Sequence, residues 1–203
     1  MTSFARVLEL PDRLALLDRL PRGGVVAEIG VQQGDFAAEI LRRSQPRLLV
    51  LIDGWRHRPD GPYLLDKSNI PQAEHDRFYA RVCERFREEL RDGRLVILRA
   101  LSGRALTMLP DGWLDWVYLD ADHSYEAVRK DLAWCSRKVK ADGLIAGHDY
   151  VEAPNQGFGV VQAVTEFCRT AGWHLVARTR KDRVCDGYDS YVIGRTPLDP
   201  RTL

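Results

Sequence analysis

Acids and a histidine that could perform chemistry gather after an apolar run of the sequence, in the segment Trp116–Tyr125 (WVYLDADHSY). Asp120, Asp122 and His123 fall within four positions there. An imidazole, with an ordinary pKa of about 6.5, can act as a general base near neutral pH. The apolar residues in front of them predict a strand, so these side chains belong at its carboxyl end, where ligands of open α/β sheets bind.

A second polar set follows the next apolar run, where His148 and Asp149 stand in the segment GHDY. If the two strands are neighbours in the sheet, Asp120, His148 and Asp149 form one cluster. Two carboxylates and an imidazole can hold a divalent metal, and an imidazole alone can remove a proton from a substrate. The alternative is that Asp122 and Asp149 are solvated turn acids and that the histidines bond locally.

A glycine turn follows the first expected strand. Glu28, Gly30 and Gly34 form the pattern E-x-G-x-x-x-G, after which the chain becomes helical. A glycine at a strand end lets a ligand approach the backbone, and the start of the helix offers N–H groups without helical partners. The dinucleotide pattern G-x-G-x-x-G would need glycine where Gln32 stands, so the turn suits a nucleoside or amino-acid group better than a diphosphate. A bare strand–helix turn is the alternative.

Three further residues stand where a nucleoside would lie. Asp53 ends the second strand, 23 positions after Gly30, and is placed to accept hydrogen bonds from both ribose hydroxyls. Trp55 could pack on an adenine ring, or it could belong to the core or a loop. Ser102 follows the third strand and could contact adenine or ribose, or cap a helix. The glycine turn and Asp53 together favour a nucleoside cofactor.

The elements that must position these residues alternate along the chain. Apolar runs predict seven strands, at Val25–Ile29, Leu48–Asp53, Leu95–Arg99, Trp116–Asp120, Leu144–His148, His174–Thr179 and Ser190–Gly194. Helical spacing predicts helices at Asp12–Leu20, Asp35–Arg43, Glu74–Leu90, Ser124–Val139 and Val160–Thr170. The last two strands are too close for a helical crossover and must form a hairpin. The pattern predicts one α/β domain over residues 1–203, with a doubly wound, mostly parallel sheet of seven strands and an antiparallel C-terminal hairpin.

Composition excludes several classes of protein. The chain has 30 basic and 29 acidic residues, a net charge of +1, which disfavours a nucleic-acid partner. No apolar stretch approaches the roughly 18 residues of a membrane span, and the N-terminus lacks a signal-peptide core, so a cytoplasmic protein is expected. The cysteines form no CxxC pair and are expected to be inert thiols: Cys83, Cys135, Cys168 and Cys185.

The chain resembles the class I S-adenosylmethionine-dependent methyltransferases in an ordered set of four features. They are the glycine turn, Asp53, the segment YLDADHSYEAVRKDL and the segment GLIAGHDY. The closest likeness is to the small-molecule O-methyltransferases related to catechol and macrolide-sugar O-methyltransferases. The resemblance covers roughly Gly23–Gly194. It implies a Rossmann-like methyltransferase fold whose antiparallel strand lies between the fifth and sixth. Many relatives are dimers, so a homodimer is one expectation.

The resemblance also implies roles for the motif residues. It assigns cofactor contacts to six of them: the methionine and ribose side to Glu28, Gly30 and Gly34, the ribose hydroxyls to Asp53, the adenine to Ser102 and the transferable methyl group to Asp120. Metal-dependent relatives hold magnesium at the positions of Asp120, His148 and Asp149. The last pair is usually Asp-Asp or Asp-Asn in those relatives, and imidazole is a softer ligand than magnesium prefers. The cation could therefore be another divalent metal, or His148 or His123 could serve as the base.

The expected reaction is methyl transfer from S-adenosylmethionine to a hydroxyl of a small molecule such as a sugar, a phenol or a natural-product intermediate. His123 or His148 would take the proton, with Asp149 as orienting residue or metal ligand. The segment 56–72, with Tyr63, and the segment 155–158, with Phe158, would cover the acceptor. The alternatives are a nicotinamide-dependent oxidoreductase and a non-catalytic nucleoside-binding module of the same fold.

Overall fold

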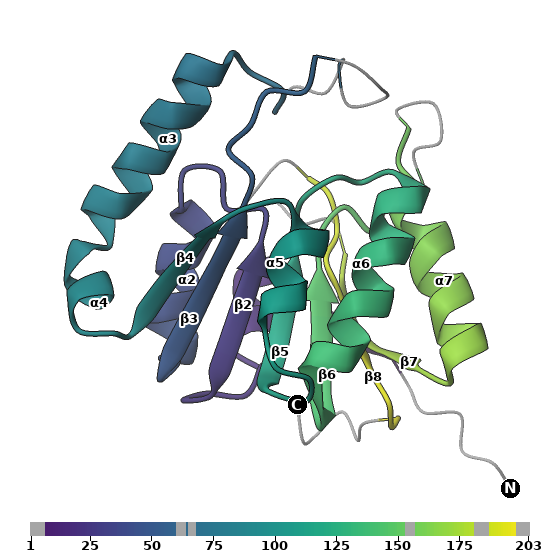
Figure 1. Cartoon of the computed structure of the whole chain (residues 1–203). Helices are drawn as coiled ribbons and strands as arrows, with labels where there is room; N and C mark the ends of the chain where they lie inside the picture. The colour runs from purple at the N-terminus through teal and green to yellow at the C-terminus, as the bar shows by residue number, and fades with distance from the viewer. Residues whose placement is uncertain (1–6, 60–63, 65–67, 153–156, 181–186, 198–203) are drawn as a thin grey trace, which may run out of the picture.

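The computed structural model describes residues 7–59, 64, 68–152, 157–180 and 187–197. Eight strands within these ranges form one sheet with helices on both faces (Figure 1). The strands are β1 (Leu8–Leu10), β2 (Val25–Ile29), β3 (Leu48–Asp53), β4 (Leu95–Arg99), β5 (Leu114–Leu119), β6 (Val139–Gly147), β7 (His174–Thr179) and β8 (Tyr191–Gly194). The helices are α1 (Arg13–Leu17), α2 (Asp35–Ser44), α3 (Gln72–Arg85), α4 (Arg87–Arg91), α5 (Ser102–Met108), α6 (Tyr125–Lys138) and α7 (Val160–Ala171).

The sheet has the order β1-β7-β8-β6-β5-β2-β3-β4. All neighbouring strands run parallel except β8, which is antiparallel to both β6 and β7. The predicted doubly wound sheet with a C-terminal antiparallel strand is therefore confirmed. The sequence predicted seven strands; the eighth, β1, adds a short parallel edge next to β7.

Two apolar layers enclose the sheet because its central strands are buried on both faces. One layer packs residues of α1, α2 and α3 against the sheet, and the other packs α5, α6 and α7 against its opposite face. Figure 1 shows α5, α6 and α7 together on the near face. None of the helices in the described ranges is long and apolar enough to cross a membrane.

The helical predictions are confirmed with two differences. The helix predicted at Glu74–Leu90 is two helices, α3 and α4, which meet at Phe86, whose backbone leaves the helical region (φ −108°, ψ 24°). Its ring is 4% exposed, so burial of that side chain accompanies the break. The short helix α5 was predicted only as a capping position at Ser102, because seven residues show too little periodicity.

Topology brings the predicted chemistry together. Strand β5 lies beside β6 in parallel, and β2 lies between β3 and β5. The carboxyl ends of these four strands therefore meet at one edge of the sheet, as the sequence analysis required for its two polar segments.

Candidate active site

The backbone of the site extends the sheet ladder past the strand ends. The amide of Asp120 donates to the carbonyl of Ile29 over 2.8 Å, and the amide of His148 donates to the carbonyl of Leu119 over 2.9 Å. These bonds hold the two polar segments in register with β2 and β5. The side chains that follow are thus placed by the regular sheet and not by free loops.

Gly30 is required by the approach of two backbones. It has a φ of +90°, and a Cβ there would lie 1.8 Å from the carbonyl oxygen of Asp120. Gly34 also has a positive φ, +79°, and caps α2. The sequence analysis explained the first glycine by ligand approach; the structure adds that the chain itself leaves no room for a side chain at Gly30.

Asp53 fastens the glycine turn to β3. Its Oδ2 accepts hydrogen bonds from the amides of Val31 and Gln32, over 2.8 and 2.9 Å, and its Oδ1 accepts one from the amide of Trp55 over 2.7 Å. Carboxylate oxygens have about four lone-pair sites in all, so these three bonds are compatible with a further donor such as a ribose hydroxyl.

Trp55 belongs to the core. It is 1% exposed, its Nε1 donates to the carbonyl of Gln32 over 2.8 Å, and its ring packs against Tyr79 at a centroid distance of 5.2 Å. An adenine needs an open ring face, which this buried indole does not offer. The structure therefore favours core packing, the alternative from the sequence, for this indole over the adenine contact.

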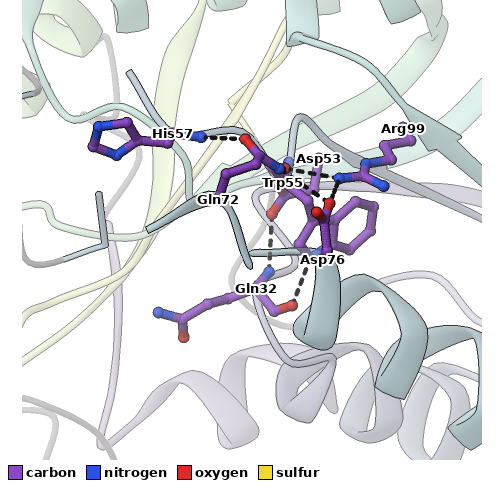
Figure 2. A network of polar contacts seen from close by, with 7 residues as sticks. All are labelled: Gln32, Asp53, Trp55, His57, Gln72, Asp76 and Arg99. Atoms are coloured by element: carbon purple, nitrogen blue, oxygen red, sulfur yellow. Dashed lines mark hydrogen bonds and ion pairs between the residues drawn. The ribbon is translucent and has the colours of Figure 1, made fainter. Parts of the chain in front are cut away.

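A polar network fixes the chain beyond Trp55 (Figure 2). The side chains of Gln72 and Arg99 both donate to the Trp55 carbonyl, over 3.0 and 3.1 Å, and both contact the carboxylate of Asp76. Gln72 also accepts a bond from the amide of His57 over 3.0 Å. The network links the ends of β3 and β4 to the start of α3. It therefore holds the first residues of the predicted covering segment 56–72 close to the glycine turn after β2.

Glu28 is a buried carboxyl group with an unsatisfied oxygen. It is 1% exposed, and its Oε2 has no hydrogen-bond partner within the described part of the chain. Burial and then the nearby charge of Asp120 raise its pKa well above the usual value. An unsatisfied buried oxygen costs about 1–3 kcal/mol, so a ligand with a positive or donor group would find a ready partner here.

Asp120, His148 and Asp149 form the cluster that the sequence predicted. Each offers one ligand atom, and these atoms lie within 4.8 Å of one another. The Nδ1 of His148 is 3.4 Å from Oδ1 of Asp149 and 3.8 Å from Oδ1 of Asp120. Two carboxylates and an imidazole at this spacing suit a divalent cation such as manganese, iron or zinc, whereas magnesium prefers oxygen ligands.

His123 joins the cluster through Asp149. Its Nδ1 lies 2.8 Å from Oδ2 of Asp149, and its ring stacks on Phe158 at a centroid distance of 4.8 Å. Its side chain is 24% exposed, whereas that of His148 is 2% exposed. Burial alone would raise the pKa of Asp149, but hydrogen bonds from His123 and His148 outweigh it and hold the pKa below its usual range.

Asp120 occupies a different electrostatic setting. Burial raises its pKa to about 6, although His148 and Arg13 attract its charged form. The sequence analysis missed Arg13, which reaches Asp120 from α1 with its Nη1 3.5 Å from Oδ2. No spacing signal in the sequence links two residues so far apart.

A pocket opens beside the cluster. It is a small hollow, partly open to solvent, and its walls include Asp120, His123, Asp131, His148 and Asp149. It lies on the α6 and α7 side of the strand ends. The clustered acids and histidines thus have a hollow next to them in which an acceptor could sit.

The predicted covering segment reaches this pocket. Arg58, within the segment 56–72, places its Nη1 2.9 Å from Oδ2 of Asp122, beside the pocket. Asp122 therefore acts as an ion-pair partner and not as part of the cluster. Tyr63 and residues 155–156 of the other predicted covering segment lie outside the described residues.

Ser102 contacts a second acid that the sequence analysis missed. Ser102 is the first residue of α5, and its Oγ donates to Oδ1 of Asp131 on α6 over 2.7 Å. Asp131 is 8% exposed, and burial raises its pKa to about 6. A signal existed: Asp131 stands at helical spacing from the buried Val128 and Cys135, an acid within an apolar stripe.

Comparison with known proteins agrees with this architecture. The family model described as "Methyltransferase domain" matches residues 27–150, from β2 through the segment that holds His148 and Asp149. The chain therefore belongs to this methyltransferase family. A search among curated proteins gave no significant match.

Solved structures with low sequence identity share the fold. An O-methyltransferase family protein from Burkholderia thailandensis superposes with a TM-score of 0.60 at 14% identity, over 91% of this chain and 55% of that one. The fibrillarin pre-rRNA processing protein of Methanococcus jannaschii gives 0.59 at 10% identity, over 87% and 68%. The M. jannaschii TYW2 in complex with AdoMet gives 0.52 at 14% identity, over 90% and 73%. The predicted Rossmann-like methyltransferase fold is confirmed.

Proposed function

We propose that this protein transfers the methyl group of S-adenosylmethionine to a hydroxyl of a small molecule. The observation that carries the proposal is the His123–Asp149 pair, which opens on a pocket at the same sheet edge as Glu28 and Asp53. The base His123, the cluster of Asp120, His148 and Asp149, and the glycine turn after β2 would then all take part in one reaction. The family match favours this function over the nicotinamide-dependent alternative.

The turn after β2 fits the cofactor. The unsatisfied oxygen of Glu28 would meet a donor of the positively charged cofactor, and Asp53 would accept from the ribose hydroxyls. Ser102 would lie at the adenine end, because α5 begins at the end of β4, next to β3. Support from other proteins comes from the fold shared with the AdoMet complex of TYW2.

His123 is our choice for the base. It combines access to solvent with a carboxylate at its Nδ1, so Asp149 can hold the ring and stabilise the imidazolium that forms. The acceptor oxygen forms its bond to the methyl carbon as the carbon–sulfur bond breaks. The hydroxyl proton passes to Nε2 of His123, and the sulfonium leaves as a neutral thioether.

The cluster of Asp120, His148 and Asp149 is our choice for a metal site. Its donor set fits a divalent cation, as described above. Such a cation would lower the pKa of a hydroxyl that it binds, and the base would then have less to do. In this arrangement Asp149 would have to serve both the cation and His123, for which its two oxygens suffice.

A small-molecule acceptor is favoured by charge. The net charge of +1 gives no basic excess for phosphate binding, although the fibrillarin relative is described as a pre-rRNA processing protein. Nucleic-acid methylation therefore ranks second.

The test is a transfer assay with S-adenosylmethionine labelled in its methyl group. The acceptors are a panel of phenols, sugars and carboxylated alcohols, with total RNA as a separate arm and manganese or a chelator as additive. We expect label in a small molecule with an ether linkage by mass spectrometry. Label in RNA alone, or in no acceptor while the cofactor binds, would contradict the proposal.

The assigned base is tested in the same assay with His123→Asn. Loss of the base should lower kcat by about 100-fold or more and leave cofactor affinity unchanged. His174→Asn, at an exposed histidine on β7, is the matched control and should retain wild-type turnover. Turnover near the wild-type rate in His123→Asn would remove His123 from the mechanism.

A further inference from the structure

Arg13 brings a positive charge to the acid cluster from outside the part of the chain that the family model matches. It is the first residue of α1, and its side chain is 18% exposed. Its Nη1 lies 3.5 Å from Oδ2 of Asp120, and its Cζ lies 4.6 Å above the ring of Phe36. These contacts, together with a hydrogen bond to Tyr118 on β5, help to fix where the guanidinium stands.

The charges around it are mostly negative. Glu28 lies within β2, Asp53 ends β3 and Asp120 follows β5. Burial raises the pKa of both Glu28 and Asp120, and Arg13 acts against this rise in each case. Acids suit the sulfonium and ammonium groups of S-adenosylmethionine. The methionine end of the same molecule also carries a carboxylate, and that group needs a cation.

The start of α2 adds to the positive potential beside Arg13. Phe36, over which the guanidinium stacks, is the second residue of this ten-residue helix. The cap is Gly34, which has no side chain, and among the described residues no side chain caps the helix. The first N–H groups of a helix lack helical partners and favour an anion. The contact with Phe36 places Arg13 near the first turn of this helix.

The spacing of the site sets an orientation. Asp53 and Asp120 stand on the strands either side of β2, two strand spacings or about 10 Å apart. A ribose held at Asp53 therefore places the methionine end of the cofactor toward Asp120, Arg13 and the start of α2.

We propose that Arg13 binds the α-carboxylate of S-adenosylmethionine, an assignment that rests on the proposed cofactor. The 3.5 Å contact with Asp120 is long for a charge-assisted hydrogen bond, which is usually 2.7–2.9 Å. A guanidinium has five N–H donors, so it can hold a ligand carboxylate together with Asp120. Arg13 is thereby a specificity residue for the amino-acid end of the cofactor.

The test compares two ligands that differ only in this carboxylate, S-adenosylmethionine and its decarboxylated form, by calorimetric titration without acceptor. The wild-type protein should bind the carboxylated form more tightly, by roughly 10- to 100-fold, the factor for one hydrogen bond between charged groups. Arg13→Met should lose this preference and bind the decarboxylated form as the wild type does. Arg13→Lys, which keeps the charge without the planar fork, should keep part of the preference.

Arg42→Met is the matched control, because Arg42 is an exposed arginine on α2 that pairs with Glu39. It should leave both affinities unchanged. Equal loss of affinity for both ligands in Arg13→Met and Arg13→Lys would show a structural role and overturn the assignment, as would a preference that survives in Arg13→Met. If the wild-type protein binds neither ligand, the proposed function fails as well, so the two failures are distinguishable.

Discussion

The proposed role of Glu28 in cofactor binding conflicts with the stability of the protein without ligand. Its buried, unsatisfied oxygen destabilises the protein without ligand, yet in the function proposed above the same oxygen would meet a positively charged cofactor. Residues retained for function often lower stability in this way. The prediction that follows separates the two effects.

Replacing Glu28 with Gln removes the charge and keeps the shape. We expect affinity for S-adenosylhomocysteine to fall by about 10-fold or more, since the carboxyl oxygens that would accept from the ammonium group of the ligand are lost. The free energy of unfolding without ligand should be at least that of the wild type. Calorimetry and urea unfolding measure the two quantities, and Glu88→Gln, at an exposed position on α4, is the control. A variant that binds normally would remove Glu28 from the cofactor site.

Asp149 should be essential for metal binding and Asp122 should not. Asp149→Asn removes one charged ligand from the cluster, so we expect affinity for manganese to fall by about 10-fold or more. Asp122→Asn is the matched control, since Asp122 is paired with Arg58. Electron paramagnetic resonance of added manganese reports the free ion in each case. Equal manganese affinity in both variants and the wild type would contradict the cluster as a metal site.

The residues of the cluster were predictable because each follows an apolar run. Asp120, His148 and Asp149 needed only the rule that parallel strands end at one edge. Arg13 was not predictable, because its contact with Asp120 depends on how α1 packs under the sheet. The burial of Trp55 was not predictable for a related reason, since a position two residues after Asp53 does not reveal whether the indole turns inward.

At the scale of elements, Gly30 sets how closely β2 approaches β5. Substitution with Ala forces a left-handed backbone, which costs about 1–2 kcal/mol, and a clash with the Asp120 carbonyl, which adds about 1–3 kcal/mol. We expect Gly30→Ala to lose about 2–5 kcal/mol of unfolding free energy. Gly23→Ala has a similar φ of +75° but nothing within 4 Å, so it should lose only about 1–2 kcal/mol. Equal losses in urea unfolding would refute the close approach.

The contact between α5 and α6 should depend on pH through Asp131. Its pKa is raised from 3.8 to about 6 in the folded protein, so the folded state binds the proton more tightly than the unfolded state. Stability from this group is present below pH 4 and is lost as pH rises through 6. Asp131→Asn keeps the shape without titrating.

The expected result is a difference between the variant and the wild type that changes with pH. Between pH 4 and pH 7, the unfolding free energy of Asp131→Asn should rise relative to that of the wild type by on the order of 2–3 kcal/mol. Chemical unfolding at several pH values measures this, with Asp142→Asn, at an exposed position, as control. A gap that stays constant over this range would show that Asp131 is not held in the environment described.

The elements themselves were predictable to within a few residues wherever the pattern was long. The strands β2, β3, β4 and β7 have the predicted bounds. For β2 and β3, an uninterrupted apolar run marks a strand covered on both faces. The three-residue β1 is too short to show a period, and it forms only because β7 offers an edge. The break at Phe86 arises from packing, which no helical periodicity encodes.

At the scale of the whole molecule, the site draws on many segments at once. The turn after β2, the ends of β3, β5 and β6, and the helices α1 and α2 all contribute residues to one edge of the sheet. A ligand bound there would contact elements far apart in the sequence, from α1 to the end of β6. Binding should therefore stabilise the folded state as a unit and not only one loop.

This coupling predicts the size of a thermal shift. A ligand that binds only the folded state adds about 2.7 kcal/mol when present at 100 times its Kd. For a chain of 203 residues, each kcal/mol moves the Tm by roughly 2–4 °C. S-adenosylhomocysteine at that concentration should thus raise the Tm by roughly 5–10 °C, as measured by differential scanning calorimetry. NAD at the same concentration should leave the Tm unchanged, because Gln32 stands where a pyrophosphate needs glycine. A larger shift with NAD than with S-adenosylhomocysteine would assign the edge of the sheet to a dinucleotide and reverse the choice of cofactor.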